Sequence, residues 1–83
     1  DAPSLSLTLY PNPVRHGVAR INLNGEGVDI SKVSIYNLTG EEVLQVVDYR
    51  NNSEISLNSL KPGIYLVKVM TNKGSITRKI SIL

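Results

Sequence analysis

Apolar and polar residues alternate along the last third of the chain. Between Tyr65 and Val69 an apolar side chain occupies every second position, and Lys68 falls between two of them. This period of two is typical of a β-strand with one buried face and one solvated face. Residues 71–74 predict a tight reversal, because Gly74 can adopt the positive φ angle that a short hairpin loop needs. The sequence therefore predicts a terminal β-hairpin with strands at residues 64–70 and 75–83.

Shorter alternating segments precede this hairpin. They predict five further strands, at residues 5–9, 19–23, 32–37, 42–47 and 54–57. In the third of these, Val33 and Ile35 share one face, while Ser34 and Tyr36 share the other. Turn signals recur about every 8 to 12 residues, as in β-sandwiches, and no stretch has helical periodicity. We therefore expect an all-β fold, a seven-stranded antiparallel Greek-key sandwich of the immunoglobulin-like kind.

The first strand ends at the segment Tyr10-Pro11-Asn12-Pro13. Neither proline carries a backbone N–H, and each biases the residue before it toward extended geometry. This segment is therefore expected to be a stiff exit that lies at a sheet edge or leaves the sheet.

The segment from Leu60 to Tyr65 contains Pro62 and Gly63 and predicts a tyrosine corner. In such a corner the ring is buried and the hydroxyl binds upstream backbone, so Tyr65 is expected to be strongly constrained. Leu57 and Leu60 are expected to close the core beside it.

Length and composition indicate one small domain. A chain of 83 residues buries only about 60% of the surface that it exposes when unfolded. The absence of cysteine excludes disulfides, thiolate metal sites and cysteine nucleophiles. Residues 1–4 have neither an initiator methionine nor the features of a signal peptide, so we expect them to be a linker remnant of a longer precursor. The folded domain is then expected at residues 5–83.

Charge is distributed unevenly along the chain. Residues 1–54 contain four basic and seven acidic side chains, whereas residues 55–83 contain five basic and no acidic side chains. One interpretation is a surface on the last hairpin that faces an anionic partner. The other is that these cations solvate outward faces and protect an exposed edge strand from pairing.

The residues needed for catalysis or metal binding do not come together in the sequence. His16 is the only histidine, and it lies in a predicted turn without an adjacent acid. Glu41 and Glu42 are neighbours, and adjacent residues point to opposite sides of a strand, so they do not form a facing pair of carboxylates. We therefore expect no catalytic, cofactor-binding or metal site.

Aromatic residues are few. Phenylalanine and tryptophan are absent, and the four tyrosines are dispersed, which argues against nucleic acid as a partner. Tyr10 and Tyr49 could still form a small platform for a glycan.

Several short motifs follow one another in a definite order. They are Leu9-Tyr10-Pro11-Asn12-Pro13, Val33-Ser34-Ile35-Tyr36-Asn37 with Gly40 and Val43, Ile55-Ser56-Leu57 with Leu60, Pro62-Gly63-Ile64-Tyr65-Leu66-Val67-Lys68-Val69, and Lys79-Ile80. In order, spacing and nearness to the chain end they resemble the type A C-terminal sorting domains of Bacteroidetes proteins exported by the type IX, or Por, secretion system. The resemblance extends from about residue 5 to residue 83.

The resemblance implies a non-catalytic secretion signal without a cofactor. In that family the domain is fused to an N-terminal cargo domain, and an outer-membrane translocon and shuttle proteins recognise it. A surface signal peptidase then usually removes the domain, and the cargo is attached to the cell surface. The implied localisation is the periplasm in transit, followed by the cell surface or the extracellular space.

The family's recognition signal is concentrated in its last strands, which correspond here to residues 63–83. The residues that the resemblance assigns to translocon recognition are Gly63, Tyr65, Lys68, Lys73, Gly74, Arg78, Lys79 and Ile80. Those assigned to the structural motif are Tyr10, Pro11, Asn12, Pro13, Gly40, Leu60 and Pro62. We expect the four cations of the first set to point outward from the hairpin, with strand addition to the exposed edge as one route of docking.

A second hypothesis is an immunoglobulin- or fibronectin-like accessory module. Such a module would bind glycan or act as a spacer beside a catalytic domain. Under either hypothesis, an exposed edge strand could pair weakly with that of a second copy of the chain.

Overall fold

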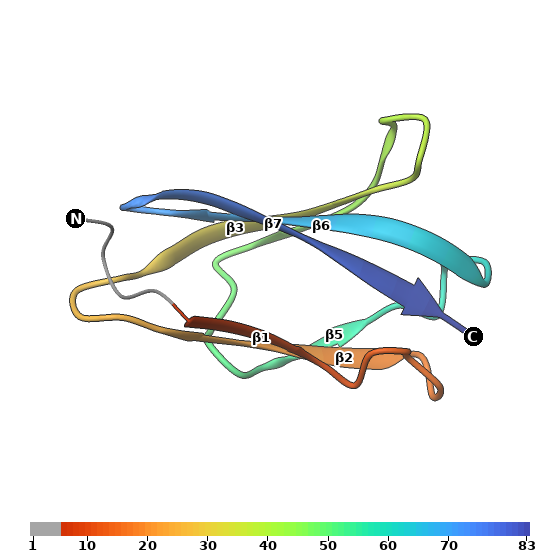
Figure 1. Cartoon of the computed structure of the whole chain (residues 1–83), viewed down its shortest axis with the longest axis horizontal. Coiled ribbons are helices and arrows are strands. Elements are labelled where there is room, and N and C mark those ends of the chain that lie inside the picture. Colours follow the sequence, from red (N-terminus) through yellow and green to blue (C-terminus); the bar gives the residue numbers. More distant parts are fainter. Residues whose placement is uncertain (1–5) are drawn as a thin grey trace.

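The structure of the protein is a computed structural model that describes residues 6–83. These residues form seven β-strands in two sheets (Figure 1). The strands are β1 (Ser6–Tyr10), β2 (Val18–Asn24), β3 (Ile30–Tyr36), β4 (Glu42–Val47), β5 (Glu54–Ser56), β6 (Gly63–Thr71) and β7 (Gly74–Ile82). The predicted start of the first strand at Leu5 and the predicted linker of residues 1–4 lie outside the described residues.

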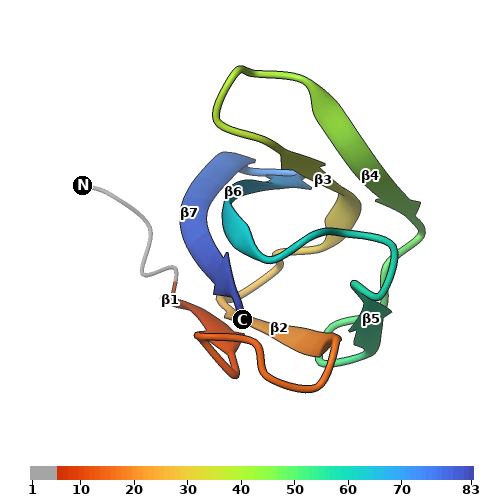
Figure 2. The ribbon, with the colours of Figure 1, turned by 90° about the vertical axis from the view of Figure 1, so that its right-hand side faces the viewer.

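The two sheets face each other as a sandwich (Figure 2). One sheet has the strand order β1-β2-β5 and the other has the order β4-β3-β6-β7. Neighbouring strands within each sheet are antiparallel. The chain changes sheet after β2, after β4 and after β5. The predicted all-β sandwich of seven antiparallel strands is therefore confirmed.

The core consists of side chains from the facing sides of both sheets. On β6 the alternation buries Tyr65, Val67 and Val69, as their period of two predicts. Leu57 lies just beyond β5 and is buried, while Leu60 packs against the core, so the predicted closure beside the corner is confirmed. The members of the buried cluster are Val14, Ala19, Ile21, Val33, Ile35, Tyr49, Ile55, Leu57, Tyr65, Val67, Val69, Ile80 and Ile82.

Ser34 differs from the simple pattern of alternation. It lies opposite Gln45 on β4 and Lys68 on β6, and thus on the outer face, as predicted. It is nevertheless only 1% exposed, and its hydroxyl has no hydrogen-bond partner among residues 6–83. Long side chains on neighbouring strands can cover a short one at the centre of a sheet. The outer face therefore excludes water at its centre.

The predicted tyrosine corner is present. Tyr65 is 9% exposed, and its hydroxyl donates a hydrogen bond of 2.7 Å to the carbonyl of Lys61, four residues upstream. This bond fixes the chain where it enters β6.

A second tyrosine anchors the turn between β4 and β5. Tyr49 is buried, and its hydroxyl accepts a hydrogen bond from the N–H of Ile21 (2.9 Å) and donates to the carbonyl of Ser53. Burial raises the pKa of the Tyr49 hydroxyl above its ordinary value of 10.0. Tyr10 and Tyr49 therefore do not form the small glycan platform that the sequence left open, because the ring of Tyr49 is inside the core.

Candidate recognition site on the terminal hairpin

β6 and β7 form the predicted hairpin through nine residue pairs, from Gly63 opposite Ile82 to Thr71 opposite Gly74. Gly74 has a φ angle of +115°, which confirms the predicted positive value. The hydroxyl of Thr71 donates to the carbonyl of Gly74 (2.6 Å) and accepts from the N–H of Lys73 (3.0 Å). The turn is thus closed by its own first residue.

The tip of the hairpin is attached to the loop between β2 and β3. The side-chain amide of Asn72 accepts from the N–H of Asp29 (2.9 Å) and donates to the carbonyl of Gly27 (2.9 Å). The backbone N–H of Asn72 also donates to the carbonyl of Asp29 (3.1 Å). These three bonds hold the tip against the β3 side of the sheet and leave the β7 side free of the loop.

Two of the candidate lysines share the outer face of the sheet. Lys68 lies opposite Thr77, and Lys79 lies opposite Leu66. Because the intervening residues of β6 face the core, these pairs face away from it. The two lysines are diagonal neighbours, about 7–8 Å apart in ordinary sheet geometry. Neither β6 nor β7 contains an acidic residue, so their positive charges add.

Arg78 lies on the opposite face from these lysines, which corrects the expectation for the four cations. It is paired with Val67, whose side chain is fully buried, so Arg78 leaves the strand on the core side. Its side chain is still exposed, because β7 is an edge strand. Its guanidinium Nη1 donates to the carbonyl of Thr77 (3.1 Å). At the margin of the core the guanidinium can stay hydrated, which avoids the free-energy cost of burying its charge.

Of the other candidate residues, some hold the hairpin together from the core and others are exposed to a partner. Tyr65 and Ile80 lie opposite each other and are both buried, so they hold the two strands together. Lys73 is exposed in the turn, and Gly63 is exposed at the start of β6 with a φ angle of +152°. A partner that contacts the folded hairpin therefore reaches its cations and its backbone rather than Tyr65 or Ile80.

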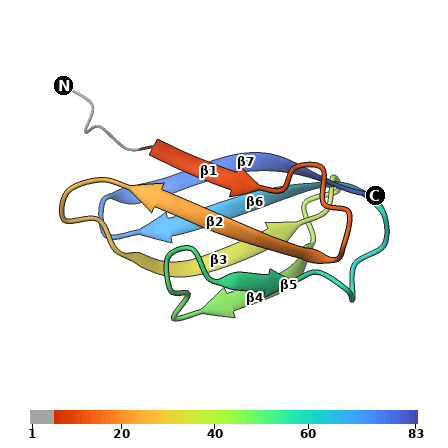
Figure 3. The ribbon, with the colours of Figure 1, turned by 90° about the horizontal axis from the view of Figure 1, so that it is seen from below.

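Residues 12–14 bind the outer edge of β7, and we call them the edge clamp. The side chain of Asn12 donates to the carbonyl of Lys79 (3.2 Å) and accepts from the N–H of Ser81 (3.1 Å). The N–H of Val14 donates to the carbonyl of Ser81 (2.7 Å), and its carbonyl accepts from the N–H of Leu83 (2.9 Å). The clamp thus closes the last third of the edge of β7 (Figure 3).

The edge clamp explains the predicted proline-rich exit from β1. The chain leaves the first sheet as expected, and then Val14 forms an isolated parallel bridge with Ile82 of the second sheet. Pro11 and Pro13 cannot donate backbone hydrogen bonds, so the Asn12 amide supplies a donor in this segment. The clamp could not be predicted from the periodic pattern, and the asparagine between two prolines is the one signal for it in the sequence.

A family model described as "Secretion system C-terminal sorting domain" matches residues 8–83 of the chain. The chain belongs to this family. The sorting domain is therefore a non-catalytic secretion signal domain of the Por, or type IX, system. Membership implies interaction with the Por secretion machinery and secretion across the outer membrane. A search of curated proteins finds no match to the sorting domain.

The remaining motif residues of the sorting domain have structural positions. Gly40 has a φ angle of +91° in the turn between β3 and β4. The side-chain oxygen of Asn37 accepts from the N–H groups of Thr39 (3.1 Å) and Glu41 (2.9 Å) in the same turn. Pro62 is exposed at the tyrosine corner.

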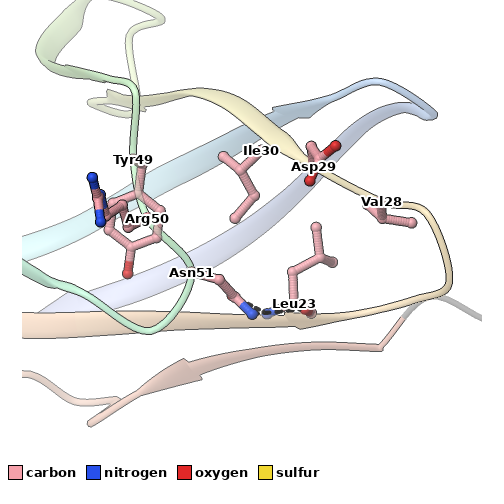
Figure 4. A pocket seen from close by; sticks show the side chains of 7 residues that line it. All are labelled: Leu23, Val28, Asp29, Ile30, Tyr49, Arg50 and Asn51. Atoms are coloured by element: carbon pink, nitrogen blue, oxygen red, sulfur yellow. Dashed lines mark hydrogen bonds between the residues drawn. The ribbon is translucent and has the colours of Figure 1, made fainter.

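A hollow of about 380 Å³ lies beside the turn between β4 and β5 (Figure 4). One of its polar side chains already binds the protein itself, since Asn51 pairs with both the N–H (2.7 Å) and the carbonyl (3.0 Å) of Leu23. The lining residues are Leu23, Val28, Asp29, Ile30, Tyr49, Arg50 and Asn51.

The described part of the sorting domain contains no group of three or more His, Cys, Asp or Glu residues that could hold a metal ion. Within residues 6–83 there is also no helix whose length and apolar character would allow it to cross a membrane.

Proposed function

We propose that this domain directs a fused N-terminal cargo through the outer-membrane translocon of the type IX system, and that the terminal hairpin is the part recognised. The observation that carries this proposal is the concentration of charge on the hairpin. Lys68 and Lys79 are neighbours on one face, Lys73 is exposed at the turn, and neither strand contains an acidic residue. A like-signed surface of this kind steers and orients a partner of opposite charge.

The finer assignment rests on the motifs of the chain. Their order supports a type A domain of a Bacteroidetes protein, spanning residues 5–83 and preceded by a linker remnant at residues 1–4. Its partners would be the translocon, shuttle proteins and a surface signal peptidase that removes the domain and leaves the cargo attached to the surface. The cargo would pass through the periplasm and then remain at the cell surface or outside the cell.

Removal of the last strand is a poor test of recognition, because Ile80 and Ile82 belong to the core and would be lost with it. Substitution of exposed lysines leaves the core intact. The double variant Lys68→Gln/Lys79→Gln removes both outer-face charges of the hairpin, and Arg15→Gln, in an exposed loop, removes a charge elsewhere as the matched control.

The experiment fuses residues 1–83 behind a periplasmic reporter in a cell with an active type IX system. An exposed charge pair contributes about 0.5 to 1 kcal/mol, so loss of two should weaken docking roughly 5- to 30-fold and reduce export accordingly. The Arg15→Gln fusion should be exported like the wild type. Wild-type export of the double-lysine variant would contradict recognition through this face.

A further inference from the structure

The outer edge of β7 is open along only part of its length. In an antiparallel strand, alternate residues direct their N–H and C=O groups to opposite sides. The edge clamp binds backbone groups of Lys79, Ser81 and Leu83, so the odd-numbered residues of β7 direct their N–H and C=O groups away from β6. The backbone groups of Ser75 and Thr77 must point the same way. In residues 6–83 no strand or loop backbone pairs with them.

The side chains beside this open segment are of two kinds. Ile76 is opposite Val69 and therefore on the core side, where it is half-buried. Arg78 follows two residues later on the same face and is exposed. β1 and β7 lie on the same side of the sandwich (Figures 2 and 3). Leu7 and Leu9 of β1 are also half-buried there, so apolar surface remains beside the open edge.

We propose that an extended segment of the secretion machinery adds as a strand to the edge of β7 at residues 75–79. The segment would carry an acidic side chain facing Arg78 and an apolar side chain two positions away facing Ile76. Main-chain bonds to Ser75 and Thr77 would supply affinity, and these two side chains would supply selectivity. This inference rests on the proposed function, because the partner that it describes is a component of that machinery.

Charge disfavours a second copy of this chain as the occupant. Antiparallel pairing about a two-fold axis at Thr77 places each Arg78 opposite Ile76 of the other copy. The two guanidinium groups would then be diagonal neighbours on one face, roughly 7–8 Å apart, and would repel. The edge clamp also stops the pairing from extending beyond Lys79. A strand with an acidic residue opposite Arg78 would be attracted to the guanidinium, whereas a second copy of the chain would be repelled by it.

A direct test measures amide hydrogen exchange by NMR on the ¹⁵N-labelled chain. The probe is a soluble ten-residue peptide with threonine at every other position and with glutamate and valine taking turns at the positions between, so that glutamate and valine lie on one face of the strand. The control peptide has lysine in place of glutamate. The acidic peptide should slow exchange at the amides of Ser75 and Thr77 roughly tenfold, the effect of one added hydrogen bond. Equal protection by the lysine peptide, protection at β1 instead, or no protection would overturn the proposal.

Two pairs of variants test the same edge in cells with the reporter fusion. Thr77→Pro removes an outward N–H without touching the ladder to β6, whereas Thr77→Val keeps it. Arg78→Glu reverses the charge, whereas Arg78→Lys retains it. Export should fall for the first variant of each pair and persist for the second. Thermal unfolding identifies any variant that fails to fold, and if Thr77→Pro is one, the arginine pair decides.

The outcomes separate this inference from the proposed function. If the double-lysine variant loses export while Thr77→Pro and Arg78→Glu are both exported normally, strand pairing is overturned and the proposed function remains. If the double-lysine and the edge variants are all exported normally, both fail.

Discussion

The three tyrosine hydroxyls near turns provide a graded test of which contacts hold the sandwich together. Tyr49→Phe removes a hydroxyl that lies between the N–H of Ile21 and the carbonyl of Ser53. Tyr65→Phe removes a single bond to the carbonyl of Lys61. Tyr10→Phe removes a bond at the protein surface, since the hydroxyl of the half-buried Tyr10 donates to the exposed side chain of Asn52.

The expected magnitudes follow from what each substitution leaves behind. A hydrogen bond contributes about 1 kcal/mol net, but an unpaired buried donor costs about 1–3 kcal/mol. Ile21 is fully buried, so Tyr49→Phe should lower the free energy of unfolding by about 2–3 kcal/mol. Lys61 is exposed and its carbonyl can bind water instead, so Tyr65→Phe should cost about 1 kcal/mol. Tyr10→Phe should cost less than either.

Chemical and thermal unfolding measure this series. A domain of this size is stable by about 4–12 kcal/mol, and 1 kcal/mol shifts its Tm by about 4–8 °C. Tyr49→Phe should therefore lower Tm by about 10–20 °C and Tyr65→Phe by about 4–8 °C. The denaturant m-value should not change, because each ring remains in place. Equal effects at Tyr49 and Tyr65, or the reverse order, would refute the argument from the buried N–H.

Three further outcomes are expected. The pKa of Tyr49 is raised above 10.0 in the folded state, so the contribution of this hydroxyl to stability is complete below pH 10 and is lost as pH rises through the folded pKa. The difference in unfolding free energy between wild type and Tyr49→Phe, measured by urea titration, should therefore shrink at alkaline pH. Asn12→Ala should cost about 1–2 kcal/mol in urea unfolding through its two bonds to β7, whereas Asn24→Ala, at the exposed end of β2, should be nearly neutral; equal losses would contradict the clamp. Ser34→Ala removes a buried hydroxyl without a partner and should raise the urea midpoint, by up to about 1 kcal/mol in stability; a lower midpoint would indicate that the hydroxyl is satisfied.

The strands and the terminal hairpin could be predicted because their signals are local. Alternation on β6 depends only on neighbouring residues, and a glycine at position 74 by itself predicts a turn with a positive φ angle. The tyrosine corner was also predictable, since Tyr65 binds a carbonyl only four residues away.

The face of Arg78 could not be predicted from its charge. A charged residue in a strand is expected to face solvent, but the two-residue loop at Asn72 and Lys73 sets a register that places Arg78 opposite Val67. An edge position permits this arrangement, because the side chain can reach water around the margin of the sheet. The position at the edge follows from the order of the sheet, which is not a local property.

The burial of Tyr49 could not be predicted from the sequence for a similar reason. Its surroundings are polar and contain Asp48 and Asn52, both with positive φ angles, so the segment has the composition of a solvated loop. The hydroxyl of Tyr49 nevertheless binds β2, which is 28 residues earlier in the chain. Contacts over such distances leave no periodic pattern in the sequence.

Three asparagine side chains show what the sequence pattern concealed. Asn12, Asn51 and Asn72 each use both the donor and the acceptor of the amide on backbone groups of another segment. A primary amide offers the same donor and acceptor as a peptide group, so it can continue a strand pairing where the backbone itself has turned away. Asparagine therefore closes strand edges and loops here, besides its usual role in turns.

The contacts of Asn12 also show which part of the β7 edge remains unpaired. On β7 the amide of Asn12 and the backbone of Val14 cover residues 79–83. Within residues 6–83 no backbone group and no asparagine side chain reaches Ser75 or Thr77, and only the guanidinium of Arg78 contacts the carbonyl of Thr77. An open main-chain edge next to Arg78 is unfavourable for a second copy of the chain and favourable for an acidic strand. Lys79 is thus the boundary between two parts of the β7 edge. Beyond it the edge clamp stabilises the end of the strand, and before it lies the proposed site of strand addition.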